Sequence, residues 1–164
     1  MIICIVAIIL LIAVDQLVKY WVVAHLAVGE TAPLLPGFVE LLRLHNYGAA
    51  WSSFSGMRYL LIALTSMLMV FLAVLLIKKI VRHPLGLTAV TLTLAGGIGN
   101  LIDRIRLGYV VDMFNFQFIS YPVFNVADMC IVFGVILLLV YYLFFYEKYD
   151  GKKARRYGKG GGGA

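Results

Sequence analysis

The sequence has 164 residues, a length that suits one ordinary domain or a small membrane protein. Hydrophobic residues make up 63% of it, whereas soluble domains usually have roughly 45 to 50%. Charged residues make up only 13%, against ~25% in soluble domains. The mean hydropathy is +0.97, and the formal net charge of +6 is concentrated in one short loop and at the C-terminal end. These values exclude soluble enzymes, secreted disulfide scaffolds and disordered chains, and they indicate a membrane protein with several spans.

Four apolar segments are long enough to cross a bilayer as helices. A hydrocarbon core about 30 Å thick needs roughly 20 helical residues. In chain order, the four segments lie at about residues 2–24, 60–77, 85–102 and 126–145. We expect an all-α membrane protein in which residues 1–150 form one four-helix domain, with a small β element and loops on its outer face. Residues 151–164 are expected to form a basic, Gly-rich flexible tail.

The first segment contains two charged residues, and the long connection after it mixes turn and strand signals. Asp15 and Lys19 are spaced i, i+4, so they share one helix face and are predicted to form a structural pair. In the following connection, residues 38–44 (FVELLRL) suit a short strand. Residues 45–56 (HNYGAAWSSFSG) mix aromatic and small side chains, which is typical of a turn at the membrane interface.

The second segment carries no charge, whereas the third is rich in Gly, Ala and Thr and ends in a polar face. Ala95 and Gly99, four residues apart, predict a surface for close helix packing. Asn100, Asp103 and Arg104 follow at helical spacing on a single face. Asp103 next to Arg104 suits an exposed surface pair and a functional pair equally well.

Two further aspartates lie around the start of the fourth segment. Asp112 is in the middle of a β-prone run, residues 109–118 (YVVDMFNFQF), in the second outer connection. Asp128 is in the first turn of the fourth segment, where the helix dipole favours a carboxylate although hydrocarbon is close. A charged group at that depth must face protein or water, so we interpret Asp128 as functional.

The distribution of basic residues predicts the orientation in the membrane. Four spans place both termini on the same side as the loop 78–86, and that side holds nine of the 14 Lys and Arg residues. By the positive-inside rule this side is cytoplasmic, and the connections 25–59 and 103–125 face outward. The polar residues of the spans then fall near the outer ends of their helices, in one layer with Asp112.

Two carboxylates in one layer indicate a particular chemistry. Like charges held close together cannot both stay ionised, so such a pair keeps one proton; one member can deprotonate water while the other donates to a carbonyl oxygen. A serine mechanism would use the serines of residues 52–55 with His45, but no acid is suitably spaced. The other histidines are scattered and Cys4 and Cys130 lie in apolar runs, so neither a metal site nor a disulfide is predicted.

Five sequence blocks occur together in an order that points to a family. They are DQLVK at 15–19, NYGAAW at 46–51, GGIGNLIDR at 96–104, VVDMF at 110–114 and FNVADM at 124–129. Over about residues 10–145 the chain resembles the lipoprotein signal peptidase family, also called signal peptidase II or prolipoprotein signal peptidase. The resemblance implies a bacterial inner-membrane aspartic endopeptidase, which removes the signal peptide from diacylglyceryl-modified prolipoproteins by cutting before the lipidated cysteine.

The resemblance also implies roles for individual residues. Asp112 and Asp128 match the family's catalytic pair, with no metal or other cofactor. Substrate-binding and supporting roles are implied for residues around the pair, which are Asn46, Asn100, Arg104, Asn125, Asp15, Lys19, Trp51 and Ala127. A larger side chain at Ala127 is expected to crowd the pair, and the loop that contains Trp51 is expected to close over the substrate as a lid.

The implied partners are lipid-modified prolipoproteins and membrane lipid, with cyclic peptide inhibitors of the family type and no nucleic acid. We expect a monomer in the bacterial cytoplasmic (inner) membrane, with both termini cytoplasmic. The alternative from another class is a small ion- or proton-coupled transporter subunit, in which Asp15, Asp103 and Asp128 would line a path. Such a path should place ionisable groups at several depths, whereas these lie near one face. A non-catalytic assembly protein would explain the glycine packing surface but not the polar layer.

Overall fold

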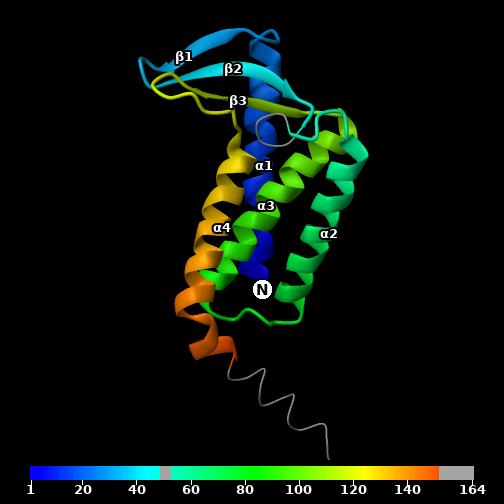
Figure 1. The fold of residues 1–164 in the computed structure, drawn as a ribbon, viewed down its shortest axis with the longest axis vertical. Coiled ribbons are helices and arrows are strands. Elements are labelled where there is room, and N and C mark those ends of the chain that lie inside the picture. Colours follow the sequence, from blue (N-terminus) through cyan, green and yellow to red (C-terminus); the bar gives the residue numbers. More distant parts are fainter. Residues whose placement is uncertain (49–52, 152–164) are drawn as a thin grey trace, which may run out of the picture.

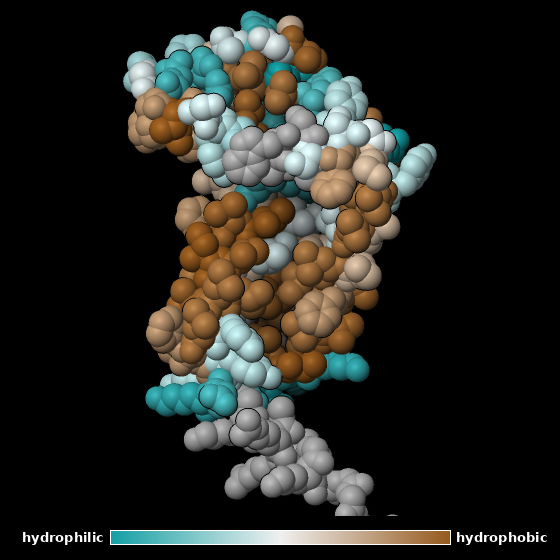
Figure 2. Space-filling model, in the orientation of Figure 1, coloured by the Kyte–Doolittle hydropathy of each residue, from teal (hydrophilic) through white to brown (hydrophobic). Residues whose placement is uncertain are grey.

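The computed structural model describes residues 1–48 and 53–151 and shows a helix bundle capped by a small sheet (Figure 1). The bundle consists of α1 (Ile2–His25), α2 (Arg58–Ile77), α3 (Pro84–Arg106) and α4 (Val126–Phe144), and a short π-helical segment, η2 (Glu147–Gly151), follows it. These helices are long and apolar enough to cross a membrane. Their side chains form the apolar band of Figure 2, which lies between more polar zones at the two ends. The expected fold class is confirmed.

Helix α3 is the centre of the bundle, because it contacts α1, α2 and α4. Glycine makes the close approach feasible: a Cβ at Gly99 would lie 2.7 Å from Asp15 Oδ2 and 3.3 Å from the Ala127 Cβ. Ala95 is also buried. The predicted packing surface is therefore present, with α1 and α4 as its partners. Helices α2 and α4 flank α3 and, within the described residues, share no extended contact (Figure 1).

Both ends of α3 can be explained from local chemistry. His83 is the N-cap, since its Nδ1 accepts a hydrogen bond from the Leu85 N–H at 3.3 Å, and Pro84 follows in the first turn, where no N–H partner is needed. The helix ends at Arg106, beyond the predicted residue 102. The extra turn is stable because its polar residues lie among other polar groups of the protein, as described below.

The sheet has the order β1-β2-β3 and is antiparallel throughout. Its strands are β1 (Thr31–Leu35), β2 (Val39–Asn46) and β3 (Val110–Phe116). The runs 38–44 and 109–118 predict β2 and β3, whereas β1 has no signal in the sequence because Pro33 interrupts it. Proline is tolerated there because β1 is an edge strand.

A small apolar core fixes the sheet to the C-terminal end of α1. Val22 of α1 and Leu26, the residue that follows the helix, pack with Leu41 of β2 and with Val111 and Met113 of β3, and all five are buried. Asp112 lies between Val111 and Met113 in β3, and successive side chains of a strand point to opposite faces. The Asp112 side chain therefore leaves the face opposite to the one that packs on α1. This alternation directs the Asp112 side chain away from the α1 contact and toward the helix bundle.

Candidate active site

The start of α4 brings Asp112 and Asp128 together through one residue, Asn125. Asn125 is the N-cap of α4: its Oδ1 accepts from the Asp128 N–H at 2.8 Å, and Asp128 Oδ2 accepts from the Asn125 N–H at 3.2 Å. This reciprocal capping box holds Asp128 in the first turn. The Asn125 Nδ2 donates to Asp112 Oδ1 at 2.6 Å. The residue that begins the helix therefore links both carboxyl groups.

Two further amides bind the remaining oxygens of the carboxyl pair. Asn46, at the end of β2, donates from Nδ2 to Asp112 Oδ2 at 2.9 Å. Asn100 of α3 donates from Nδ2 to Asp128 Oδ1 at 2.7 Å. Each carboxyl oxygen thus accepts one hydrogen bond from a neutral donor and keeps a lone pair. A proton or a water molecule can still be held on the side that these amides leave open.

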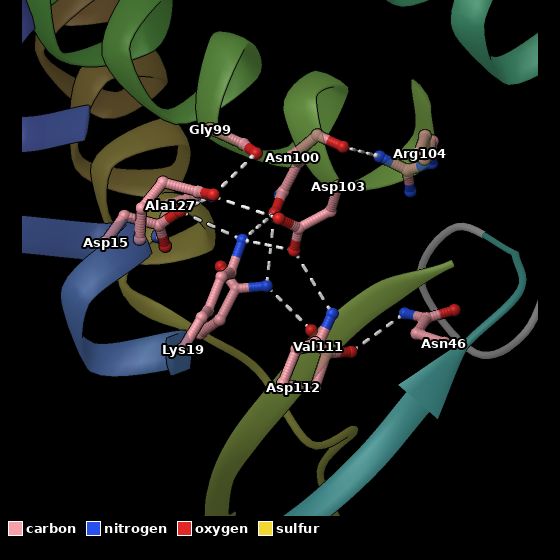
Figure 3. Close-up of polar contacts among 12 residues, drawn as sticks. Asp15, Lys19, Asn46, Gly99, Asn100, Asp103, Arg104, Val111, Asp112 and Ala127 are labelled. Carbon is pink, nitrogen blue, oxygen red and sulfur yellow. Dashed lines mark hydrogen bonds and ion pairs between the residues drawn. The ribbon is translucent and has the colours of Figure 1, made fainter. Parts of the chain in front are cut away.

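Lys19 orients Asn100 by donating to its side-chain oxygen (Figure 3). Its Nζ lies 3.0 Å from Asn100 Oδ1 and 2.9 Å from an oxygen of both Asp15 and Asp103. Because Lys19 and Asn125 both donate to the Asn100 oxygen, the amide of Asn100 must present its NH2 group to Asp128. The predicted pair of Asp15 and Lys19 is confirmed, as part of a larger network.

The two aspartates that bind Lys19 also hold the elements that carry the carboxyl pair. Asp15 Oδ1 accepts from the Ala127 N–H at 2.9 Å, next to Asp128 in α4. Asp103 Oδ2 accepts from the Val111 N–H at 3.2 Å, next to Asp112 in β3 (Figure 3). One buried cation therefore connects α1, α3, α4 and β3.

The electrostatics of Asp112 favour a bound proton near neutral pH. Burial and then the negative charge of Asp128 raise the pKa of Asp112 to about 7. Hydrogen bonds from Asn46 and Asn125 and the charge of Lys19 act in the opposite direction, but they are outweighed. Asp112 is 1% exposed and Asp128 is half-buried, so the second carboxyl has access to an adjoining cavity.

That cavity lies between α2 and α4 with α3 as its floor, and it has a volume of about 390 Å3. Its apolar wall includes Leu61 of α2 and Ile131 of α4, and Gly97 contributes bare backbone from α3. Asp112 and Asp128 line its polar end, together with Asn46, Asn100 and Arg104. An apolar chain segment in the cavity would thus end at the carboxyl pair.

Arg104 supplies a positive charge on the other side of the carboxyl pair. Its Nη2 donates to the Gly48 carbonyl oxygen at 2.9 Å, and its Nη1 is 3.5 Å from the Asn100 carbonyl oxygen. Arg104 therefore fixes the start of the loop after β2. Trp51 and the rest of residues 49–52, on which the lid prediction depends, lie outside the described residues.

The structure adds to or changes the sequence-based interpretation at three positions. Asp103 is 3% exposed and pairs with Lys19, so it is not part of an exposed pair with Arg104. The Ala127 methyl faces Gly99 on α3, so a larger side chain there would first push the two helices apart. Gln16 had no predicted role, yet its Nε2 donates to Asp103 Oδ1 at 2.9 Å. Its place in the DQLVK block and its i, i+3 spacing from Lys19 are the signals that could have identified it.

The described residues contain no group of three or more His, Cys, Asp and Glu side chains arranged to hold a metal ion. The chemistry that this site supports with its own groups is acid–base catalysis by a pair of carboxyl groups that share a proton.

The family model of signal peptidase (SPase) II matches residues 7–144. The chain belongs to the signal peptidase II family. It is 41% identical to a lipoprotein signal peptidase of Enterococcus faecalis, over 93% of this chain and 91% of that protein. It is also 43% identical to a lipoprotein signal peptidase of Lactococcus lactis, over 79% of this chain and 85% of that protein.

Solved structures agree with this family membership. A bacterial membrane enzyme with 30% sequence identity superposes with a TM-score of 0.81 over 85% of this chain and 87% of its own. A second structure of a bacterial membrane enzyme, with 29% sequence identity, superposes with a TM-score of 0.79 over 87% of this chain and 93% of its own. The family resemblance that the five sequence blocks indicate is confirmed. The prediction of a peptidase with several membrane spans is confirmed as well. The transporter alternative receives no support.

Proposed function

We propose that this signal peptidase II family member is an aspartic endopeptidase that removes the signal peptide from diacylglyceryl-modified prolipoproteins, cutting before the lipidated cysteine. The observation that carries the proposal is the carboxyl pair, Asp112 and Asp128, which Asn125 joins. The pair lies at the polar end of the cavity between α2 and α4, which we call the membrane-facing cavity. Relatives of the chain named lipoprotein signal peptidase support the choice of substrate.

Asp112 and Asp128 are the catalytic residues in this proposal. The ionised carboxylate takes a proton from water, the water oxygen attacks the scissile carbonyl carbon, and the protonated carboxyl gives its proton to the carbonyl oxygen. The tetrahedral intermediate then collapses: the C–N bond breaks, the leaving amine takes the proton from the first carboxyl, and the second recovers its proton from the intermediate's hydroxyl. The pair returns to its starting state without a cofactor.

The surrounding polar residues position the pair and the substrate. Asn46, Asn100 and Asn125 hold the carboxyl oxygens, and Lys19 with Asp15 supports them from within the bundle. Arg104 lines the cavity beside the pair, where it can bind a substrate carbonyl. The apolar segment of a signal peptide reaches the cavity sideways through the bilayer, between α2 and α4.

The enzyme resides in the bacterial cytoplasmic membrane as a monomer surrounded by lipid, with both termini in the cytoplasm. Nine of 14 basic residues on one side of the four spans support this orientation. The carboxyl pair then faces the outer side, where prolipoproteins emerge. Cyclic peptides that fill the same cavity should compete with substrate.

The test is release of a signal peptide by the purified protein in lipid. The substrate is a synthetic prolipoprotein segment with a diacylglyceryl-modified cysteine, and its unlipidated twin is the control. We expect a free signal peptide and a product that begins with the lipidated cysteine, from the lipidated substrate only. Absence of cleavage in active lipid, or equal cleavage of the unlipidated twin, would contradict the proposal.

A further inference from the structure

A second cavity, of about 480 Å3, lies on the outer side of Asp112. Among the described residues it is lined by the end of β2 (44–47), Ser55 and the segment 120–123, together with Asp112. Asn46, Asp112 and residues 121–123 line this outer cavity and the membrane-facing cavity alike. Asp112 therefore stands where the two cavities meet.

The two cavities differ in the chemistry of their walls. The membrane-facing cavity has an apolar wall that includes Leu61 and Ile131. The outer cavity keeps some apolar wall, including Leu44, and adds the polar side chains of His45, Tyr47, Ser55 and Ser120. A polypeptide that crosses Asp112 from one cavity to the other would pass from an apolar to a more polar environment. A prolipoprotein changes in the same way at its cleavage site, since the signal peptide is apolar and the mature chain enters water.

His45 is a firmly positioned side chain among the residues that line the outer cavity alone. Its ring stacks on Tyr109 with centroids 3.8 Å apart, and its Nε2 lies 3.4 Å from Arg43 Nη2. Arg43 is itself held by the Val23 and Leu26 carbonyl oxygens, at 3.2 and 2.8 Å. A guanidinium can only donate, so Nε2 accepts and the ring proton is on Nδ1. Burial and the charge of Arg43 lower the pKa of His45, which keeps the ring neutral at pH 7.

We propose that the outer cavity is a subsite for the first residues of the mature polypeptide, with His45 as its specificity-determining residue. The inference rests on the proposed function. His45 Nδ1–H has no hydrogen-bond partner among the described residues, so it is available to a backbone carbonyl or an acidic side chain of the substrate. Arg43 behind the ring makes lysine or arginine at these substrate positions unfavourable.

The test compares two lipidated substrates with the same signal peptide. One ends at the lipidated cysteine as an amide, and the other continues for six residues of mature chain. His45→Phe keeps the ring stack on Tyr109 but removes the donor. We expect it to lower kcat/KM for the extended substrate by about tenfold, the effect of one lost hydrogen bond, and to leave kcat/KM for the short substrate unchanged. Replacing the first mature residue after the cysteine with Glu or Lys should show a preference for Glu that His45→Phe weakens.

The chain offers a matched control in His25, which also stacks on an aromatic ring, Trp21, at the outer end of α1. His25→Phe should leave both substrates unaffected. If His45→Phe misfolds, Ser120→Trp provides a second variant, because Ser120 is exposed at the rim of the cavity and a large ring there would obstruct it. It should weaken cleavage of the extended substrate selectively.

The outcomes separate the subsite from the proposed function. If the wild type cleaves neither substrate, the proposed function fails and the subsite fails with it. If the wild type cleaves both but His45→Phe and Ser120→Trp affect neither, or affect both equally, the proposed function stands and the subsite is overturned. A selective loss on the extended substrate supports the subsite.

Discussion

Asn125 illustrates how a single residue serves folding and catalysis together. Its side-chain oxygen caps α4, and its NH2 group binds Asp112 and the oxygen of Asn100. Both the oxygen and the NH2 group of one short amide thus help to position the two carboxyl groups. An aspartate at this position could cap the helix but would add a third negative charge beside the pair.

The first prediction concerns the two aspartates themselves. Asp112→Asn and Asp128→Asn preserve shape but remove the shared proton, so water cannot be activated while the carbonyl is protonated. Each variant should lose several orders of magnitude in kcat, and the double variant should be little worse than either, because residues that act as a unit are not additive. Signal peptide release measures this, and the thermal unfolding of each variant verifies its folding. Substantial cleavage by a folded single variant would exclude the mechanism.

The second prediction concerns pH and follows from the raised pKa of Asp112, about 7 against an ordinary 3.8. Because the folded state binds this proton more tightly than the unfolded state, the stabilisation is complete below about pH 4 and is lost as the pH rises to 7. Over this window the free energy of unfolding should fall by up to about 1.4 kcal/mol per pH unit, and Asp112→Asn should flatten the slope.

Thermal unfolding in lipid between pH 4 and 8 measures how the free energy of unfolding changes with pH. The control is His25→Phe, a substitution that is remote from the carboxyl pair. Activity should decline above about pH 7 for the same reason, since Asp112 then loses the proton that the mechanism needs. An Asp112→Asn variant with the slope of the wild type would mean that Asp112 does not carry the proton.

At the scale of the elements, the position of the carboxyl pair depends on how closely α1 and α4 approach α3. Gly99 is the point where α3 meets both of these helices, because a Cβ there would lie 2.7 Å from Asp15 Oδ2 of α1 and 3.3 Å from the Ala127 Cβ of α4. Asp15 cannot move without losing its contacts to Lys19 and to the Ala127 N–H. The active site and the helix packing therefore share the same atoms.

The third prediction is that Gly99→Ala destabilises the protein by about 1 to 3 kcal/mol and lowers activity, as expected for overpacking against rigid neighbours. Gly97→Ala is the matched control in the same helix, because the three atoms nearest to its added Cβ all belong to the flexible side chain of Met69. Its effect on stability should be under about 1 kcal/mol. The free energy of unfolding in lipid decides between them, and equal losses would contradict the packing argument.

Sequence patterns predict some of these elements well and others not at all. The four helices follow from the length of apolar runs, and β3 follows from a run of β-prone residues around Asp112. Strand β1 and the last turn of α3 have no such signal, because both depend on partners elsewhere in the chain. Asp103 is an example: its sequence neighbours suit an exposed pair and a functional pair with Arg104 equally well, and its burial follows from a contact with Lys19, 84 positions earlier in the chain.

At the scale of the whole molecule, the polar network lies at one end of the apolar band, and the loop after α2, with Lys78, Lys79 and Arg82, lies at the other (Figures 1 and 2). The sequence blocks could predict the carboxyl pair, because VVDMF carries Asp112 and FNVADM carries Asp128. They could not predict the outer cavity, which forms only when β2 and the segment 120–123 come together above Asp112. Segments that are distant in the sequence can lie side by side without any periodic pattern in the sequence that would predict it.

The fourth prediction concerns orientation. Nine of 14 basic residues lie on the side of the loop 78–86, so that side should be cytoplasmic and the carboxyl pair should lie on the outer side. With Cys4 and Cys130 replaced by alanine, single cysteines at Arg82 and Ser120 place one exposed thiol at each end of the bundle.

An impermeant thiol reagent applied to intact cells should label Ser120→Cys and spare Arg82→Cys, and permeabilised cells should show labelling of both. The prediction is demanding because the outer side is also required by the chemistry: the mature chain must leave the site into the aqueous space beyond the membrane, through the cavity next to Asp112. Labelling of position 82 but not of position 120 in intact cells would reverse the topology. It would also place the carboxyl pair where an exported substrate could not reach it.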